Sequence, residues 1–407
     1  MRVLAGTKPD GAKLKYVDSL RGIAILMVIL THANRFIANL QQPVELLSDY
    51  GQMGVQLFFI VSAFTLCLTF DKRNMEEKGL SKFYIRRYFR IAPLYYFGIL
   101  LYLAYFSLFE PMLYNLPSEW DERYNLRNIL VNMFLVNDFT PGPANNKIVP
   151  GGWSIGTETS FYILFPFIFS LYQRFGTNHW ALLLLPLIAI AGCFVIVQIV
   201  LAATGMTAKN NSFLYFNIVC QLPVFLFGMS LYFLLKLKHR FTQLKPRVYA
   251  VGFLLSTLVA FVVYAYTSEM AFFVPIAAGF SFLFLFMLFK TSKRTLFKMN
   301  WLSRIGQLSY SIYLFHFIFA WVGSKLLWSL MADVASSEII YLTNVLLTVV
   351  LTVGVALFSE KYIEKPGINL GRKLITYLEA RKATGNLQRA KRRLILDQEL
   401  NRKFEIN

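Results

Sequence analysis

The chain has 407 residues, of which 56% are hydrophobic and only 15% are charged. A soluble domain of this composition would leave much apolar surface in water, so the composition argues against a soluble protein and for several membrane-spanning segments. The formal net charge is +19, and the positions of the basic residues decide whether this charge points to nucleic acid. Polar and basic residues at the start run directly into an apolar segment, so we expect no cleavable signal.

Ten apolar segments are long enough to cross a bilayer. They lie near residues 22–40, 54–70, 92–109, 152–172, 180–203, 213–235, 249–267, 269–289, 305–328 and 338–360. The sequence therefore predicts an all-α polytopic membrane protein with about ten transmembrane helices. Only Ser268 and Glu269 separate the seventh and eighth segments, which predicts a tight helical hairpin.

The basic residues lie mainly on one side of these segments. With the N-terminus in the cytoplasm, all but six of the 41 Lys and Arg residues are cytoplasmic; the six are Arg35, Arg123, Arg127, Lys147, Lys209 and Lys325. This distribution follows the positive-inside rule and predicts that both termini are cytoplasmic. It also accounts for the net charge, so we expect no nucleic-acid partner.

Two stretches are not predicted to span. Residues 110–151 form a long outside segment with a short amphipathic piece, LRNILVNMFLV. Residues 1–366 are expected to form the membrane-embedded domain, and residues 367–407 a basic cytoplasmic tail, folded as an amphipathic helix on the anionic inner leaflet. The cysteines all lie in apolar segments, which favours helix packing over disulfides or a metal site; they are Cys67, Cys193 and Cys220.

The first segment contains RGIAILMVILTHANRF, in which His32 follows Arg21 by eleven residues. This spacing places His32 roughly 16 Å along a helix from Arg21, near the middle of the bilayer, with Arg35 on the same face. In the ninth segment His316 follows Arg304 by twelve residues, or roughly 18 Å. The two histidines are therefore predicted to lie at nearly equal depth.

Glu158 lies about six residues inside the outer end of the fourth segment, roughly 9 Å deep. A charged group within a membrane helix costs on the order of 2.5–3.5 kcal/mol, so it needs a partner or a water-filled cavity. We expect Arg35 and His32 to be that partner. The alternative is that the three residues form a purely structural ion-pair network.

A basic stretch, LSKFYIRRYFRIAPLYYF, precedes the third segment. In a helix Lys82, Arg86 and Arg90 would form a stripe, with Arg87 beside it. Guanidinium groups bind phosphate oxygens in pairs, which favours a phosphate site at the cytoplasmic mouth. The alternative is a basic anchor to the membrane surface.

Six motifs in order resemble the acyltransferase-3 family of integral membrane acyltransferases, which includes O-acetylases of O-antigen, capsule and other surface glycans. They are YVDSLRGIAILMVILTH, GVQLFFIVSAF, FYIRRYFRIAP, WSIGTETSFYILFP, LSYSIYLFH and SEKYIEKP, between Tyr16 and Pro366. The resemblance implies a roughly ten-helix domain that uses cytoplasmic acyl-CoA. The family motifs match here at Arg21, His32, Arg87, Arg90, Trp153, Ser154 and Glu158.

The chain departs from the family at three points. The family often has Ser-Gly-Phe where this chain has Ala63 in the middle position, which suggests different helix packing. It often has a second acidic residue where this chain has Thr159, which leaves Glu158 without a carboxylate neighbour. Some members carry an extracytoplasmic SGNH domain, which we do not expect here because the tail is short.

The resemblance implies transfer of an acyl group, favouring acetyl, from acetyl-CoA to a hydroxyl of a surface or envelope carbohydrate such as a polysaccharide or lipopolysaccharide. A hydroxyl attacking a thioester needs a base and an oxyanion partner. We assign the base to His32, its orientation to Glu158 and an oxyanion or carboxylate contact to Arg35, and we keep His316 as a further catalytic candidate. A second mechanism stays open, in which His32 itself carries the acyl group.

The expected donor site uses Arg87 and Arg90 with Arg86 and Arg21. Acyl-CoA is expected as a substrate, with no permanently bound cofactor and no metal, and membrane lipids as further partners. The expected location is the bacterial inner (plasma) membrane. Two other function classes are alternatives: a transporter or flippase of glycans or small hydroxylated metabolites, and a non-enzymatic sensor or scaffold.

Overall fold

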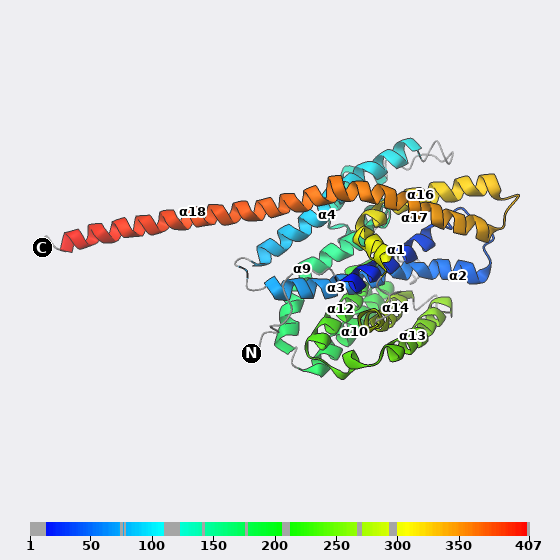
Figure 1. Cartoon of the computed structure of the whole chain (residues 1–407), viewed down its shortest axis with the longest axis horizontal. Helices are drawn as coiled ribbons and strands as arrows, with labels where there is room; N and C mark the ends of the chain where they lie inside the picture. Colours follow the sequence, from blue (N-terminus) through cyan, green and yellow to red (C-terminus); the bar gives the residue numbers. More distant parts are fainter. Residues whose placement is uncertain are drawn as a thin grey trace.

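The computed structural model describes residues 14–73, 76, 79–109, 123–140, 143–175, 178–205, 212–266, 271–292 and 299–404, and in this part of the chain there are helices and turns but no β-strands. Figure 1 shows the main helices. They are α1 (Lys15–His32), α2 (Gln42–Tyr50), α3 (Gly54–Arg73), α4 (Gly79–Ala104), α7 (Leu126–Met133), α8 (Pro143–Asn146), α9 (Gly152–Phe175), α10 (His179–Thr204), α11 (Ser212–Tyr215), α12 (Ile218–Lys236), α13 (Pro246–Tyr266), α14 (Val274–Thr291), α15 (Asn300–Gln307), α16 (Ser309–Met331), α17 (Ser337–Ser359) and α18 (Lys365–Phe404). The all-α prediction is confirmed.

Within these described ranges, nine helical stretches are long and apolar enough to cross a membrane. They correspond to every predicted segment except the first, which is α1. The 18 residues of α1 include Lys15, Asp18 and Arg21, so this helix is less suited to face lipid. It is instead enclosed by its neighbours, and the architecture is close to the ten helices predicted.

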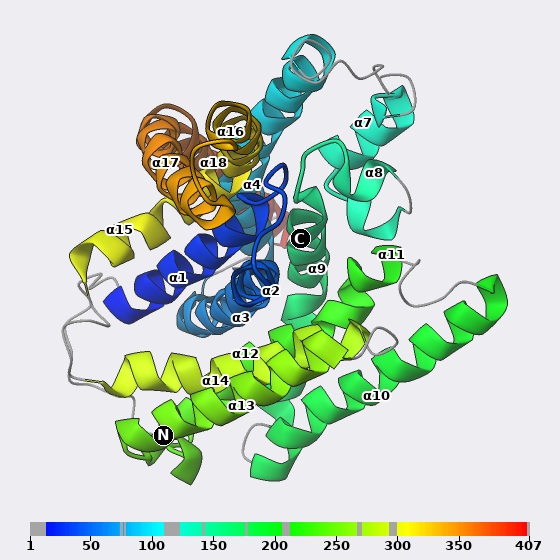
Figure 2. The same ribbon diagram turned by 90° about the vertical axis from the view of Figure 1, so that its right-hand side faces the viewer.

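α1 packs at the centre of the bundle against α3, α15 and α16, as Figure 2 shows in end view. Gly54 of α3 lies directly against the backbone carbonyl of Ala24, and Gly306 of α15 against that of Asp18. A Cβ atom at either glycine would overlap these carbonyl oxygens, so only glycine permits this close approach between helices. These contacts fix the position of α1 and of the residues at its end.

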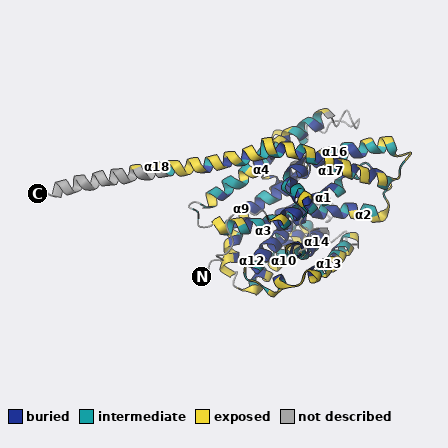
Figure 3. Cartoon of the chain, in the orientation of Figure 1, coloured by how far each residue is buried: buried dark blue, intermediate teal, exposed yellow. Residues whose placement is uncertain are grey.

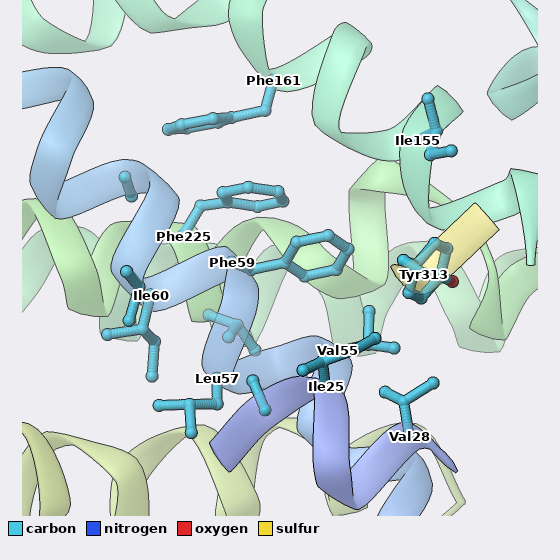
Figure 4. Close-up of a cluster of buried hydrophobic side chains, with 14 of the residues drawn as sticks. Ile25, Val28, Val55, Leu57, Phe59, Ile60, Ile155, Phe161, Phe225 and Tyr313 are labelled. Carbon is cyan, nitrogen blue, oxygen red and sulfur yellow. The ribbon is translucent and has the colours of Figure 1, made fainter. Parts of the chain in front are cut away.

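Stacked aromatic rings join three further helices in the core (Figure 4). Phe225 of α12 lies between Phe59 of α3 and Phe161 of α9, with ring centroids 4.3 Å and 4.1 Å apart. Such large buried rings contribute much apolar contact at little conformational cost. They hold α3 and α9, which carry residues of the candidate site, at a fixed separation.

The outer helices present apolar side chains to their surroundings. Leu254 of α13 is 66% exposed and Ile188 of α10 is 65% exposed, and Figure 3 shows exposed positions along α13. A row of such side chains would be unfavourable in water but suits the hydrocarbon of a bilayer. The predicted hairpin pairs α13 with α14, which pack along each other; Ser268 and Glu269 themselves lie outside the described residues.

Two helix ends differ from the predicted segments. α1 ends at His32 instead of continuing to residue 40. Residues 33–36 form a turn, and Asn39 further along adopts a positive φ of 58°. α4 begins at Gly79, so the basic stretch and the third apolar segment form one helix. The piece LRNILVNMFLV contains α7, which has eight residues and is too short to cross, as expected.

α18 follows α17 through a π-helical turn, Glu360–Glu364. Its first part runs along α4, and the helix then extends away from the bundle (Figure 1). The tail expected from residue 367 is therefore the continuation of a helix that starts inside the bundle.

Candidate active site

A cavity of about 600 Å³ lies where α1 ends, and we call it the outer cavity. It is lined by cationic and aromatic side chains from segments far apart in the sequence. They include His32, Arg35, Arg123, Lys147, Trp153, Phe216, Tyr313, Phe317 and Trp321. His32 is the last residue of α1, so its ring lies at the end of the helix, where it lines the outer cavity.

His32 lines this cavity, and His316 is its neighbour on the side away from the cavity. His316 Nδ1 lies 2.7 Å from the carbonyl oxygen of Tyr313, and His32 Nδ1 lies 2.8 Å from that of Val28. Because a carbonyl oxygen only accepts hydrogen bonds, each Nδ1 carries the proton when its ring is neutral. His316 Nε2, 3.3 Å from His32 Nδ1, is then an acceptor, and His32 Nε2 is left unprotonated.

This arrangement gives the two histidines different chemical capacities. Both nitrogens of His316 are engaged, and its side chain is fully buried. His32 lines the cavity and keeps one free lone pair. His32 can therefore take a proton or bond to a carbon atom from the cavity, whereas His316 holds the ring of His32 in place.

Arg35 lies in the turn after α1, not in the helix as expected. Its guanidinium carbon is 4.3 Å from the ring centroid of Trp321, a favourable stacking of a cation on an aromatic face. Within the described part of the chain it forms no ion pair, so the expected pairing with Glu158 is not present. Its charge is thus available to the contents of the outer cavity.

Glu158 lies in a smaller cavity of about 100 Å³, the middle cavity. Its Oε1 accepts hydrogen bonds from the hydroxyl of Ser62 and, at 2.7 Å, from that of Tyr162. These neutral donors, and not His32 or Arg35 as expected, are its direct partners. The carboxylate is therefore satisfied at membrane depth without a direct ion pair.

Arg21 also lines the middle cavity. It donates to Thr65 Oγ1 at 3.1 Å and lies 3.4 Å from the carboxylate of Asp18. Thr159, where relatives of the predicted family often have an acidic residue, donates to the carbonyl of Ile155 at 2.8 Å. This hydroxyl forms a hydrogen bond within its own helix and adds no negative charge to the cavity.

A third cavity of about 530 Å³, the inner cavity, lies beside the basic part of α4 and the first part of α18. The described charged residues that line it are Arg73, Glu76, Arg86, Arg87, Arg90 and Arg372. Arg86 forms a 2.7 Å ion pair with Glu76, which holds the pKa of that carboxyl below its usual value. Five guanidinium groups around one carboxylate make this cavity suited to a polyanion.

The three cavities follow one another through the bundle. The inner and middle cavities share Arg87 and Arg90, and the middle and outer cavities share Val55 and Tyr313. Tyr313 accepts a hydrogen bond from Ser154 Oγ at 2.7 Å and donates to the carbonyl of Gly151 at 3.0 Å. Tyr313 therefore lies between the middle cavity, which part of the basic cluster lines, and the outer cavity, which His32 lines.

Sequence reasoning did not assign roles to Tyr313, Tyr162 or Ser62. Two signals were available. Tyr162 follows Glu158 by four residues on α9 and Tyr313 precedes His316 by three on α16, spacings that place each pair on one helix face. Ser62 is on another helix, so its contact with Glu158 could only come from tertiary structure.

Comparisons of the sequence with known proteins give its family and its relatives. The sequence profile of a family described as an acyltransferase domain matches residues 14–360. O-acetyltransferase OatA of Staphylococcus aureus is 25% identical over 90% of this chain and 59% of its own length. Peptidoglycan O-acetyltransferase OatA of Listeria monocytogenes is 28% identical over 41% of this chain and 26% of its own length.

The chain thus spans less than two thirds of these curated relatives. No solved structure matches it at a significant level. The family match nevertheless covers most of the 407 residues, including every helix that lines the outer and middle cavities. The chain belongs to the acyltransferase-3 family of integral membrane acyltransferases.

Proposed function

We propose that this protein is a membrane O-acetyltransferase that moves an acetyl group from cytoplasmic acetyl-CoA to a hydroxyl of a cell-envelope carbohydrate, at the bacterial inner (plasma) membrane. The observation that carries the proposal is the line of three cavities from the arginine cluster to His32. The family and the names of the OatA relatives support acetyl transfer to oxygen.

The donor enters from the inner cavity. Arg86, Arg87 and Arg90 bind its phosphate groups, because guanidinium groups form paired, charge-assisted hydrogen bonds with phosphate oxygens. Arg21 adds positive charge in the middle cavity, along the path of the pantetheine arm. The thioester at the end of that arm extends past Arg87 and Arg90 toward Tyr313.

The reaction takes place at the outer end of this path. The acceptor hydroxyl oxygen attacks the thioester carbonyl carbon, the carbon–sulfur bond breaks, and coenzyme A leaves as a thiolate. His32 Nε2 takes the hydroxyl proton and can return it to the thiolate or to solvent. Arg35 is the available donor for the oxyanion, because Tyr313 already donates its hydroxyl proton to the carbonyl of Gly151.

A two-step route uses the same atoms. His32 Nε2 attacks the thioester and displaces the thiolate. The acceptor hydroxyl oxygen then attacks the acyl carbon, the carbon–nitrogen bond breaks, and the hydroxyl proton passes to the released Nε2 or to the thiolate. Both routes need Nε2 free and the ring held still. The contacts of His32 with Val28 and His316 supply both conditions.

Glu158 acts in the middle cavity in this proposal. Its negative charge offsets Arg21, Arg87 and Arg90 where a neutral thioester must pass, and its hydrogen bonds position Tyr162 and Ser62 along the wall. The acceptor occupies the outer cavity, whose lining includes Trp153 and Trp321 beside cationic and polar side chains. A mainly aromatic lining with a few polar groups is typical of sites for sugar rings.

The test is reconstitution. Purified protein in liposomes is given acetyl-CoA and total envelope glycans, and mass spectrometry follows the addition of acetyl groups while free coenzyme A is measured. The proposal predicts acetylated glycan and stoichiometric release of coenzyme A. Movement of glycan across the membrane without consumption of acetyl-CoA would identify a transporter instead.

A further inference from the structure

The inner cavity has a wall that the family match does not include. The match ends at residue 360, whereas Ile368, Gly371, Arg372, Ile375 and Thr376 of α18 line the cavity. These positions recur every three or four residues, so one face of α18 is turned toward the arginines of α4. The first turns of α18 are therefore part of the cavity, not a separate tail.

Several contacts hold this part of α18 against α4. Gly367 lies against Pro93 and Gly371 against Phe89, where a Cβ atom would come within 2.7 Å of either neighbour. Lys82 of α4 forms an ion pair with Glu379, two turns further along α18. Small residues and an ion pair on the same face fix α18 at a distance at which Arg372 reaches the cavity.

The order of the cavities indicates where each part of the donor binds. Arg87 and Arg90 line both the inner and middle cavities, so they stand at the throat through which the pantetheine arm passes. The diphosphate is attached directly to that arm and stays at the throat. The ribose 3′-phosphate lies beyond the diphosphate, toward the residues that line only the inner cavity, among them Arg372.

We propose that the first turns of α18 complete the donor site and that Arg372 binds the 3′-phosphate of coenzyme A. This inference rests on the proposed function, since it takes acyl-CoA as the donor. Arg372 is free to do this: its one described side-chain contact is a 3.2 Å hydrogen bond to Asn369 of the same helix. Ile368 and Ile375 supply an apolar surface beside it for the adenine ring.

An anionic lipid headgroup presents the same chemistry, a phosphate oxygen facing a guanidinium, and the inner cavity lies near the predicted inner leaflet. The two sources differ in one respect. Binding of coenzyme A through Arg372 depends on its 3′-phosphate, while a lipid site is indifferent to it.

The experiment measures dissociation constants of coenzyme A and of 3′-dephospho-coenzyme A for the full chain in phosphatidylcholine nanodiscs. The wild type is expected to bind coenzyme A roughly tenfold more tightly than the dephospho form, a factor that corresponds to about 1.4 kcal/mol. Arg372→Ala is expected to bring this ratio close to one without weakening the dephospho form. Lys373→Ala is the matched control, because Lys373 is the next residue, is also exposed, and does not line the cavity.

Each other outcome is decisive. The inference would be overturned if Arg372→Ala kept the wild-type ratio of the two dissociation constants. It would also be overturned if Lys373→Ala lowered that ratio as much as Arg372→Ala does. A further outcome is that the double variant Arg87→Ala, Arg90→Ala abolishes binding of both ligands while Arg372→Ala keeps the wild-type ratio of dissociation constants. That result would support a donor site at the arginines of α4 and would contradict a role for α18 in it. If the wild type binds neither ligand, the proposed donor itself fails. An effect of Arg372→Ala that appears only when phosphatidylglycerol is added would assign the cavity to lipid.

Discussion

Replacing His316 with phenylalanine should reduce acetyl transfer by only about fivefold. The substitution removes the acceptor Nε2, which lies 3.3 Å from His32 Nδ1, but leaves the Val28 carbonyl at 2.8 Å from the same nitrogen. His32 thus keeps its tautomer and loses one neutral hydrogen bond, whose net value is about 1 kcal/mol. Loss of the base itself costs 10²–10⁴-fold, roughly.

The assay is turnover of acetyl-CoA by variants reconstituted at matched amounts, with kcat and KM determined separately. The loss should fall on kcat, because His316 lies behind His32 and does not line the outer cavity. His316→Gln should recover most of the rate, since its side-chain carbonyl can accept from His32 Nδ1. A loss in His316→Phe as large as in His32→Ala would refute this reasoning and move the base to α16.

Three further expectations concern other parts of the molecule. Arg87→Ala with Arg90→Ala should weaken acyl-CoA binding by at least tenfold while the protein still inserts, because charged hydrogen bonds contribute on the order of 1.5–3 kcal/mol each; unchanged binding in a titration would make the cluster only an anchor. Glu158→Gln should keep the Tyr162 contact but leave the arginine charges uncompensated, so turnover should drop with coenzyme A affinity equal or higher, and a lower affinity would count against this role. In a cysteine-free background, Arg127→Cys should react with an impermeant thiol reagent on intact cells and Lys245→Cys should not; both positions are exposed, and the reverse pattern would invert the topology.

The helices were largely predictable from the sequence because length and apolar composition alone decide whether a segment can span. The equal depth of His32 and His316 was also predictable, since the rise per residue of an α-helix turns the number of residues between two positions into a distance along the axis. What the sequence could not supply was the end of α1. Arg35 is the third residue after His32, and whether that spacing means one helical turn or a change of direction depends on packing around Ala33, which is fully buried.

The partner of Glu158 was mispredicted for a related reason. Charge complementarity favoured Arg35, but depth along two helices does not fix their rotation about their axes. The hydroxyl groups of Ser62 and Tyr162 face Glu158 instead. The role of α18 was hidden because its basic composition resembles that of any surface tail, whereas the contacts of Gly367 and Gly371 with α4 show that its first turns are packed.

The most direct test of the central claim is turnover by His32→Ala compared with acyl-CoA binding by the same protein. His179→Ala is the control, because His179 is an exposed histidine at the start of α10 and lines none of the three cavities. The account predicts that His32→Ala loses transfer by about 10²–10⁴-fold with binding of acyl-CoA nearly intact, while His179→Ala behaves as wild type. Near-wild-type acetylation by His32→Ala would contradict it.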